Sequence, residues 1–117
     1  MIRHKPIYDP IDPAKDGYRL LVTRLWPRGI RKSAVDSWDQ RLGAPVELIR
    51  KKKAGKLTKA DLRMTYLAAL DREALKDAAA LARKRTVTLL CTCRDDLCHR
   101  VVLATALRRK LRARRPS

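Results

Sequence analysis

The sequence predicts an α/β domain in which a small, mainly parallel sheet of about three strands is covered by helices. Two short runs, residues 18–26 with a near-continuous apolar centre and residues 86–91 with β-branched and apolar residues, have the composition of strands buried on both faces. Longer segments between and after them carry Ala and Leu at helical spacing. Strands separated by helices favour parallel pairing, because a parallel connection needs a crossover. The 117 residues fit a single domain, 1–117, with a basic end at 108–117 that we expect to be frayed.

The first quarter of the chain predicts two strands joined by a loop. Residues 2–8 read as a short strand, and Pro6 favours a place at the sheet edge because proline has no N–H to donate. Turn-forming residues fill positions 9–17 and predict a loop. Residues 18–26 form the first buried strand, and the turn at 27–29 ends it.

Two helices are expected next. Asp36 is a suitable N-cap for a short helix that carries Trp38 and Leu42. Pro45 and Gly55 then bracket a second helix, in keeping with the preference for Pro at helix starts and Gly past helix ends.

The second half of the chain predicts three helices and one strand. Thr58 resembles the start of a capping box, and a break near Asp71 would separate two helices. Residues 86–91 are the second buried strand. Apolar spacing from Val101 to Leu111 predicts the last helix.

The charge balance favours anionic partners. Lys and Arg number 29 against 12 acids, which gives a formal net charge of +17. Such a charge suits nucleic acid or a phosphorylated small molecule, although a solubilising surface is an equally simple explanation. The oligomeric state is left open.

The sequence predicts a cytoplasmic protein without a membrane partner. No apolar stretch approaches the roughly 20 residues that span a bilayer, and the first residues have no signal-peptide core. Three cysteines, an odd number, fit a reducing compartment better than a disulfide framework.

All three cysteines and one histidine lie within residues 91–100, where a strand precedes a helix. Cys98 would fall in the first helical turn, where free N–H groups favour a thiolate. Because neighbouring helical residues point about 100° apart, we expect His99 to serve Cys91 or Cys93 rather than Cys98. The structural alternative is a buried Cys98 and a hydrogen-bonding His99.

A metal site is the less favoured interpretation of this segment. Cys91, Cys93, Cys98 and His99 together offer a Cys₃His set, which zinc accepts. Their spacing departs from that of structural zinc sites, and adjacent Cys98 and His99 are not expected to reach one ion. We therefore expect no cofactor, with zinc as the alternative.

The turn after the first buried strand is a second candidate site. Arg24 and Arg28 flank Trp26 and precede Gly29, an arrangement that suits a phosphate or a stacked base. The alternative is a structural turn in which Trp26 packs and the arginines pair with nearby carboxylates.

These residues resemble a bacterial family of unknown function, the domain of unknown function 488. The similarity covers nearly the whole chain, and the Arg-Leu-Trp-Pro-Arg-Gly segment is its most specific part. It is carried by Tyr8-Asp9-Pro10, residues 16–30, Trp38, residues 42–48, Tyr66 and residues 87–90. The resemblance implies a small Rossmann-like domain with no settled biochemical function, and it points to Arg24, Trp26, Arg28, Gly29 and Tyr66.

The chain departs from the short branch of that family in three places. Thr23 stands where an Asp is common, and Ala69 stands near a usual Glu. Cys91 with Cys98-His99-Arg100 looks more like the other branch. The resemblance therefore implies no specific activity.

Taken together, these patterns predict one composite pocket at neighbouring strand ends, lined by residues 24–29 and 91–100. As a hypothesis, Arg24, Arg28 and Arg100 hold an anion such as a phosphate or nucleotide. Cys98 would be the reactive thiol, with Cys91 or Cys93 as its resolving partner and His99 as proton carrier. The competing hypotheses are a nucleic-acid-binding accessory protein with structural cysteines, and a zinc-binding protein. The sequence leaves open whether the protein is an enzyme.

Overall fold

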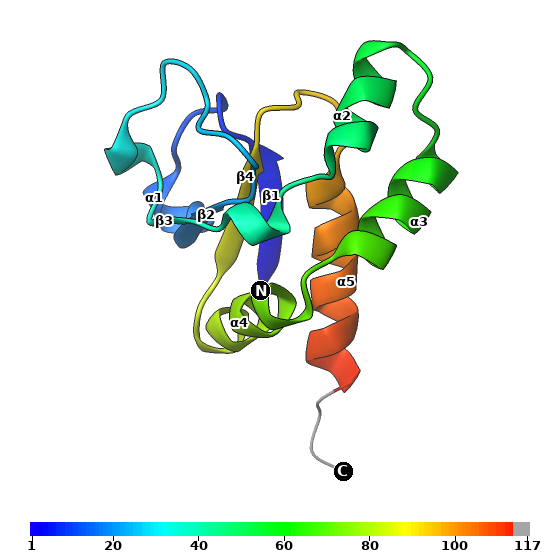
Figure 1. Cartoon of the computed structure of the whole chain (residues 1–117). Helices are drawn as coiled ribbons and strands as arrows, with labels where there is room; N and C mark the ends of the chain where they lie inside the picture. Colours follow the sequence, from blue (N-terminus) through cyan, green and yellow to red (C-terminus); the bar gives the residue numbers. More distant parts are fainter. Residues whose placement is uncertain (114–117) are drawn as a thin grey trace.

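Four parallel strands form one sheet, in the order β1-β4-β2-β3, in the computed structural model, which describes residues 1–113 (Figure 1). The strands are β1 Ile2–Pro6, β2 Tyr18–Leu21, β3 Ser37–Trp38 and β4 Val87–Cys91. The predicted α/β class is confirmed, with one strand more than the sequence suggested.

The α-helices of the described residues are α1 Pro13–Asp16, α2 Val46–Lys53, α3 Lys59–Ala69, α4 Arg72–Lys84 and α5 His99–Ala113. The predicted boundaries of α3 and α4 are confirmed by their caps. The Thr58 hydroxyl accepts the Asp61 N–H at 3.1 Å, and the Asp71 carboxylate accepts the Ala74 N–H at 2.9 Å. Helix α5 includes residues 108–113, and the remainder of the predicted frayed end, 114–117, lies outside the described residues.

The predicted helix after Asp36 is wrong. Residues 37–38 pair with β2 instead, and a short 3₁₀ turn, Gln40–Leu42, follows. The reason is a long-range contact, because the Asp36 carboxylate accepts the backbone N–H of Arg19 at 2.7 Å. Asp36, which was predicted to be a helix cap, therefore connects the residues just before β3 to β2.

Two further differences concern the segments around β2. The predicted loop at 9–17 contains helix α1, whose N-cap Asp12 accepts the N–H of Lys15. Strand β2 ends at Leu21 rather than at residue 26, and the Thr23 hydroxyl donates to the Leu25 carbonyl at 2.7 Å. Residues 22–26 thus leave the sheet and become part of its carboxyl edge.

Strand β4 is the centre of the sheet, and every one of its residues is buried. Strand β1 pairs on one side with Pro6 opposite Cys91, so the predicted edge position of β1 is confirmed. Strand β2 pairs on the other side with Leu21 opposite Leu90. Because all pairs are parallel, the chain after β2 and the chain after β4 leave the same edge of the sheet.

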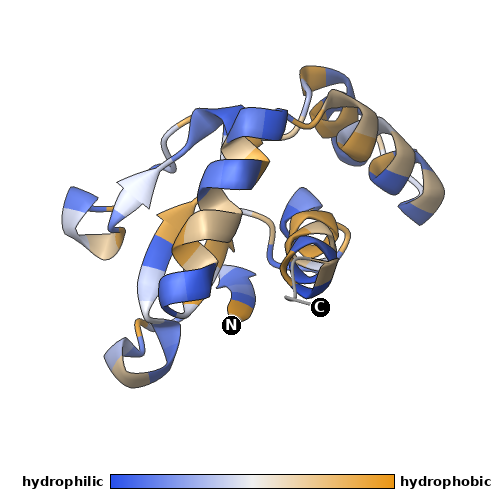
Figure 2. Ribbon diagram, turned by 90° about the horizontal axis from the view of Figure 1, so that it is seen from below, coloured by the Kyte–Doolittle hydropathy of each residue, from blue (hydrophilic) through white to orange (hydrophobic). Residues whose placement is uncertain are grey.

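The two faces of the sheet bury unequal amounts of apolar surface. Leu20, Val87 and Leu89 belong to a large aliphatic cluster with helices α3, α4 and α5, whereas Leu21 and Leu90 belong to a small cluster on the other face. Seen from below, the helices carry alternating hydrophobic and hydrophilic bands, as expected for helices with one face on a core (Figure 2). Within residues 1–113, no helix is both long enough and apolar enough to cross a membrane.

Candidate functional site

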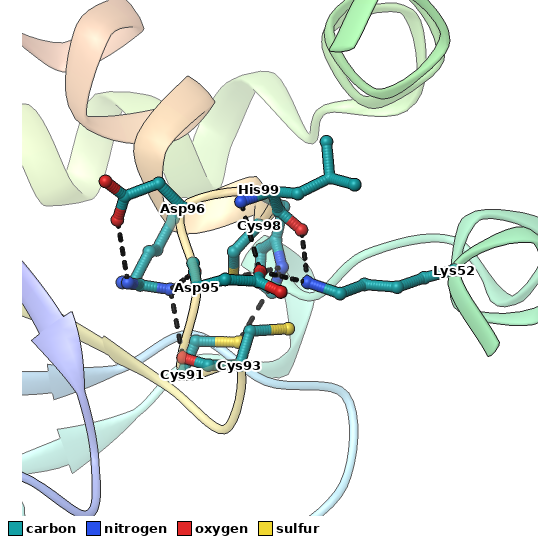
Figure 3. Close-up of polar contacts among 9 residues, drawn as sticks. Lys52, Cys91, Cys93, Asp95, Asp96, Cys98 and His99 are labelled. Atoms are coloured by element: carbon teal, nitrogen blue, oxygen red, sulfur yellow. Dashed lines mark hydrogen bonds and ion pairs between the residues drawn. The ribbon is translucent and has the colours of Figure 1, made fainter. Parts of the chain in front are cut away.

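Two cysteines and one histidine converge where β4 ends and α5 begins. Cys91 is the last residue of β4, Cys98 precedes α5, and His99 is its first residue (Figure 3). Their sulfur and ring nitrogen atoms all lie within 4.8 Å of one another, and all three residues are buried. The fold therefore gathers three soft ligands into one cluster.

The orientation of His99 is set by a backbone carbonyl. Its Nε2 atom lies 2.5 Å from the Val22 oxygen, which can only accept a hydrogen bond. Nε2 therefore carries the proton, and in the neutral ring the lone pair of Nδ1 is free. That lone pair faces the sulfurs, with Nδ1 at 3.7 Å from Cys98 Sγ and 3.9 Å from Cys91 Sγ.

The expectation that Cys98 and His99 diverge is wrong. It assumed that both residues lie in the helix, where adjacent side chains point about 100° apart. Helix α5 begins at His99, so Cys98 lies outside it and its sulfur turns toward the imidazole.

Cys93 is a half-buried third sulfur on the loop beside this cluster, and it is not one of the three residues whose ligand atoms lie within 4.8 Å of one another. The hydrogen bond with Cys93 and burial raise the pKa of Cys91, and they outweigh the lowering effect of Cys98. The pKa of Cys93 is lowered by Cys91 but raised more by Cys98 and by burial. Both groups are therefore thiols at neutral pH in the ligand-free protein.

Two cations hold the loop between β4 and α5, residues 92–98. Lys52 reaches across from α2 and donates to Asp95 Oδ1 and to the Leu97 carbonyl, both at 2.5 Å (Figure 3). This contact lowers the pKa of the Asp95 carboxyl. Arg100 donates from the other side to the carbonyls of Cys93 and Asp95, each at 3.1 Å.

The Arg100 side chain is almost fully buried and also pairs with Asp96 at 3.3 Å. These contacts hold the loop, whereas its buried Nε has no hydrogen-bond partner within the described residues. The role of Arg100 in holding an anion stays a prediction.

Tyr66, which the family resemblance pointed to, lies at the cluster. Its ring centroid is 5.3 Å from that of His99, and its hydroxyl donates to the Leu42 carbonyl at 2.7 Å. Burial raises the pKa of Tyr66 far above its usual value. The tyrosine is thus a neutral wall of the site that packs on the imidazole.

The Arg24–Gly29 turn follows the neighbouring strand, as predicted, but its side chains face elsewhere. Arg24 Nε donates to the Ala44 carbonyl at 2.9 Å, and Trp26 joins the small apolar cluster on the other face of the sheet. Arg28 and Gly29 are exposed, and Gly29 has a φ of 73°. No hydrogen bond or ion pair within the described chain joins these side chains to the cysteines.

Two members of the site were not predicted from the sequence. One is the Val22 carbonyl, which orients His99, and the other is Lys52, which lies 45 positions before Leu97, whose carbonyl it holds. A backbone carbonyl is present in every residue, so the sequence does not show which one orients a side chain. Lys52 lies within a basic run, so the sequence does not distinguish it from the neighbouring lysines.

A family model, described as the inactive DUF488-N3 subclade, matches residues 1–117 of the chain. The chain is 39% identical over 112 residues to uncharacterised protein YeaO of Escherichia coli (strain K12), which covers 92% of this chain and 96% of that protein. It is 38% identical over 96 residues to uncharacterised proteins Rv3073c of Mycobacterium tuberculosis and Mb3100c of Mycobacterium bovis, covering 74% of this chain and 70% of each. No solved structure matches.

Proposed function

This chain belongs to the DUF488 family, in the subclade described as inactive DUF488-N3, and from that premise we propose that it binds a zinc ion. The ligands are Cys91, Cys98 and His99, with Cys93 as the fourth. The observation that carries the proposal is the free Nδ1 lone pair of His99, which faces two sulfurs at close range.

The spacing of these atoms matches that of zinc ligands. A tetrahedral ion with Zn–S near 2.3 Å and Zn–N near 2.05 Å separates nitrogen from sulfur by about 3.6 Å. The distances from His99 Nδ1 to Cys98 Sγ and Cys91 Sγ are 3.7 and 3.9 Å. The two sulfurs, Cys91 Sγ and Cys98 Sγ, lie within 4.8 Å of each other, against about 3.8 Å for two thiolates on one tetrahedral zinc, so they would approach by up to about 1 Å on binding.

The surroundings also suit a zinc site. A zinc-bound histidine usually donates its other ring N–H to a carbonyl or carboxylate, which is the role that Val22 has here. Three thiolates, one neutral imidazole and Zn²⁺ sum to a charge of minus one. Lys52 and Arg100 are the cations that hold the neighbouring loop, and each also pairs with an acid, Asp95 and Asp96 respectively.

A catalytic thiol is less well supported. Cys98 is only 2% exposed, and the Arg100 guanidinium donates to two loop carbonyls, so neither of these two groups is presented to an incoming anion. The description of the subclade as inactive agrees with binding rather than catalysis.

Metal analysis of protein purified without chelator tests the proposal, and one zinc per chain is the expected result. Co²⁺ added to chelator-stripped protein should give the intense visible bands of tetrahedral coordination, with charge-transfer bands from thiolate. Cys98→Ser and His99→Asn should each weaken zinc binding by at least 100-fold, because each removes a ligand.

His4→Asn is the matched control, since it removes the other histidine and leaves the cluster unchanged. It should bind zinc within about twofold of the wild type. Absence of stoichiometric metal, or unaltered binding in Cys98→Ser, would refute the proposal.

A second candidate function is nucleic-acid binding, which the charge of +17 favours. Helix α2 ends in a basic turn, in which Arg50, Lys51 and Lys53 are exposed. Binding to duplex DNA should weaken steeply with salt and should survive replacement of all three cysteines by Ser. Binding that does not vary with salt would argue against this function. For either function we propose the cytoplasm, since reduced cysteines are retained there.

A further inference from the structure

A groove with a volume of about 670 Å³ lies between helices α3, α4 and α5 and reaches the loop before α5 at Asp96 and Leu97. Small-molecule sites usually have volumes of roughly 300–1,000 Å³. The groove is lined mainly by aliphatic side chains that are half-buried. They include Leu67, Leu70, Leu75, Val101, Val102 and Ala106.

The rim of this groove is positively charged. Lys59 and Arg63 on α3, Arg72 on α4 and Arg109 on α5 all line it and are all exposed. None of the four makes an ion pair within residues 1–113. The acid that lines the groove, Asp96, already pairs with Arg100 at 3.3 Å.

We propose that this groove binds a medium- to long-chain aliphatic carboxylate. The apolar walls would bury the hydrocarbon chain, and the unpaired cations would receive the carboxylate at the rim. A second copy of this chain is a poorer occupant, because it would bring two sets of unpaired cations together. A neutral lipid would leave the rim charges without a partner. The proposal uses none of the proposed zinc ligands and does not depend on them.

Calorimetric titration of the full-length protein with octanoate, decanoate and dodecanoate, each below its micelle concentration, tests the proposal. One ligand per chain is expected, with affinity rising by up to about fourfold for each added methylene. Dodecyltrimethylammonium, which has the same chain and the opposite charge, should bind at least tenfold more weakly than dodecanoate.

Variants separate groove binding from general attraction to a basic protein. Ala106→Trp should abolish binding by filling the groove, and the double variant Arg63→Glu with Arg109→Glu should weaken it at least tenfold. The matched control is Arg3→Glu with Lys15→Glu, which changes the net charge equally at exposed positions outside the groove. This control should bind within about twofold of the wild type, and circular dichroism should show that every variant is folded.

Several results would overturn the proposal. These are the absence of saturable binding, several ligands per chain, equal binding of the cationic surfactant, or equal weakening by the control pair. A dimer that Ala106→Trp dissociates, in a protein that does not bind dodecanoate, would instead assign the groove to a second copy.

Discussion

Replacing Asp16 with Asn should destabilise the fold in a pH-dependent manner. The Asp16 side chain is 1% exposed, lies 2.8 Å from Lys5 Nζ and 2.5 Å from Arg19 Nη1, and accepts the Asp12 N–H at 3.0 Å. Arg19 is itself almost fully buried. Asn would keep one acceptor oxygen but leave a buried guanidinium without a counter-charge.

Breaking a buried ion pair in this way lowers the free energy of unfolding by about 3–5 kcal/mol. Because the amide oxygen of Asn can still accept a hydrogen bond, we expect a loss near the lower end of this range. A loss of about 3 kcal/mol would lower the melting temperature by about 12 °C for a domain of this size. It would also remove a large part of a typical stability of about 5–15 kcal/mol. Urea unfolding at pH 7 measures this difference directly.

The pH dependence follows from the pKa of Asp16. Burial raises this pKa, but the hydrogen bonds with Lys5, Asp12 and Arg19 lower it more, so it falls below its usual value near 4. The ionic contribution is complete above the unfolded pKa and is lost as the pH falls through the folded one. The difference in the free energy of unfolding between the wild type and Asp16→Asn should therefore become smaller below about pH 4.

Asp77→Asn provides the matched control, because Asp77 pairs with Arg41 at 3.0 Å but its side chain is 62% exposed. Its effect should stay within about 0.5 kcal/mol. The reasoning would be refuted if Asp16→Asn lowered the free energy of unfolding by no more than the control does. It would also be refuted if this loss were the same at pH 7 and pH 3.5.

Three further predictions concern single contacts. Tyr66→Phe leaves the Leu42 carbonyl without its donor and should cost about 1–3 kcal/mol in urea unfolding; a change under 0.5 kcal/mol would contradict this. Gly17→Ala should fail to fold or lose more than about 2 kcal/mol, because the residue has a φ of 59° and a new Cβ would meet the Thr86 carbonyl oxygen; near-wild-type stability would argue against the strain. Lys52→Met should speed zinc release to a chelator several-fold. It should cost about 1 kcal/mol or less in the free energy of unfolding, because its partner Asp95 is largely exposed. An unchanged release rate would exclude a role for Lys52 in holding the loop.

The local parts of the fold were predictable because neighbouring residues encode them. Thr58 and Asp71 mark helix starts through hydrogen bonds that span three positions, and a run of β-branched and apolar residues identifies β4 as a buried strand. The prediction after Asp36 failed because its carboxylate bonds to Arg19, seventeen positions away, and a local reading cannot detect that competitor.

The same division applies to the candidate site. The sequence alone determined that three cysteines and a histidine lie within ten residues, and that parallel strand ends bring residues 24–29 and 91–100 to one edge. Only the tertiary structure decided which groups face one another. The Val22 carbonyl turns His99 Nδ1 toward the sulfurs, and the carbonyls of Cys93 and Asp95 accept hydrogen bonds from the buried Arg100. Backbone acceptors look alike in every sequence, so their effect on a side chain becomes visible only when the packed chain brings the two together.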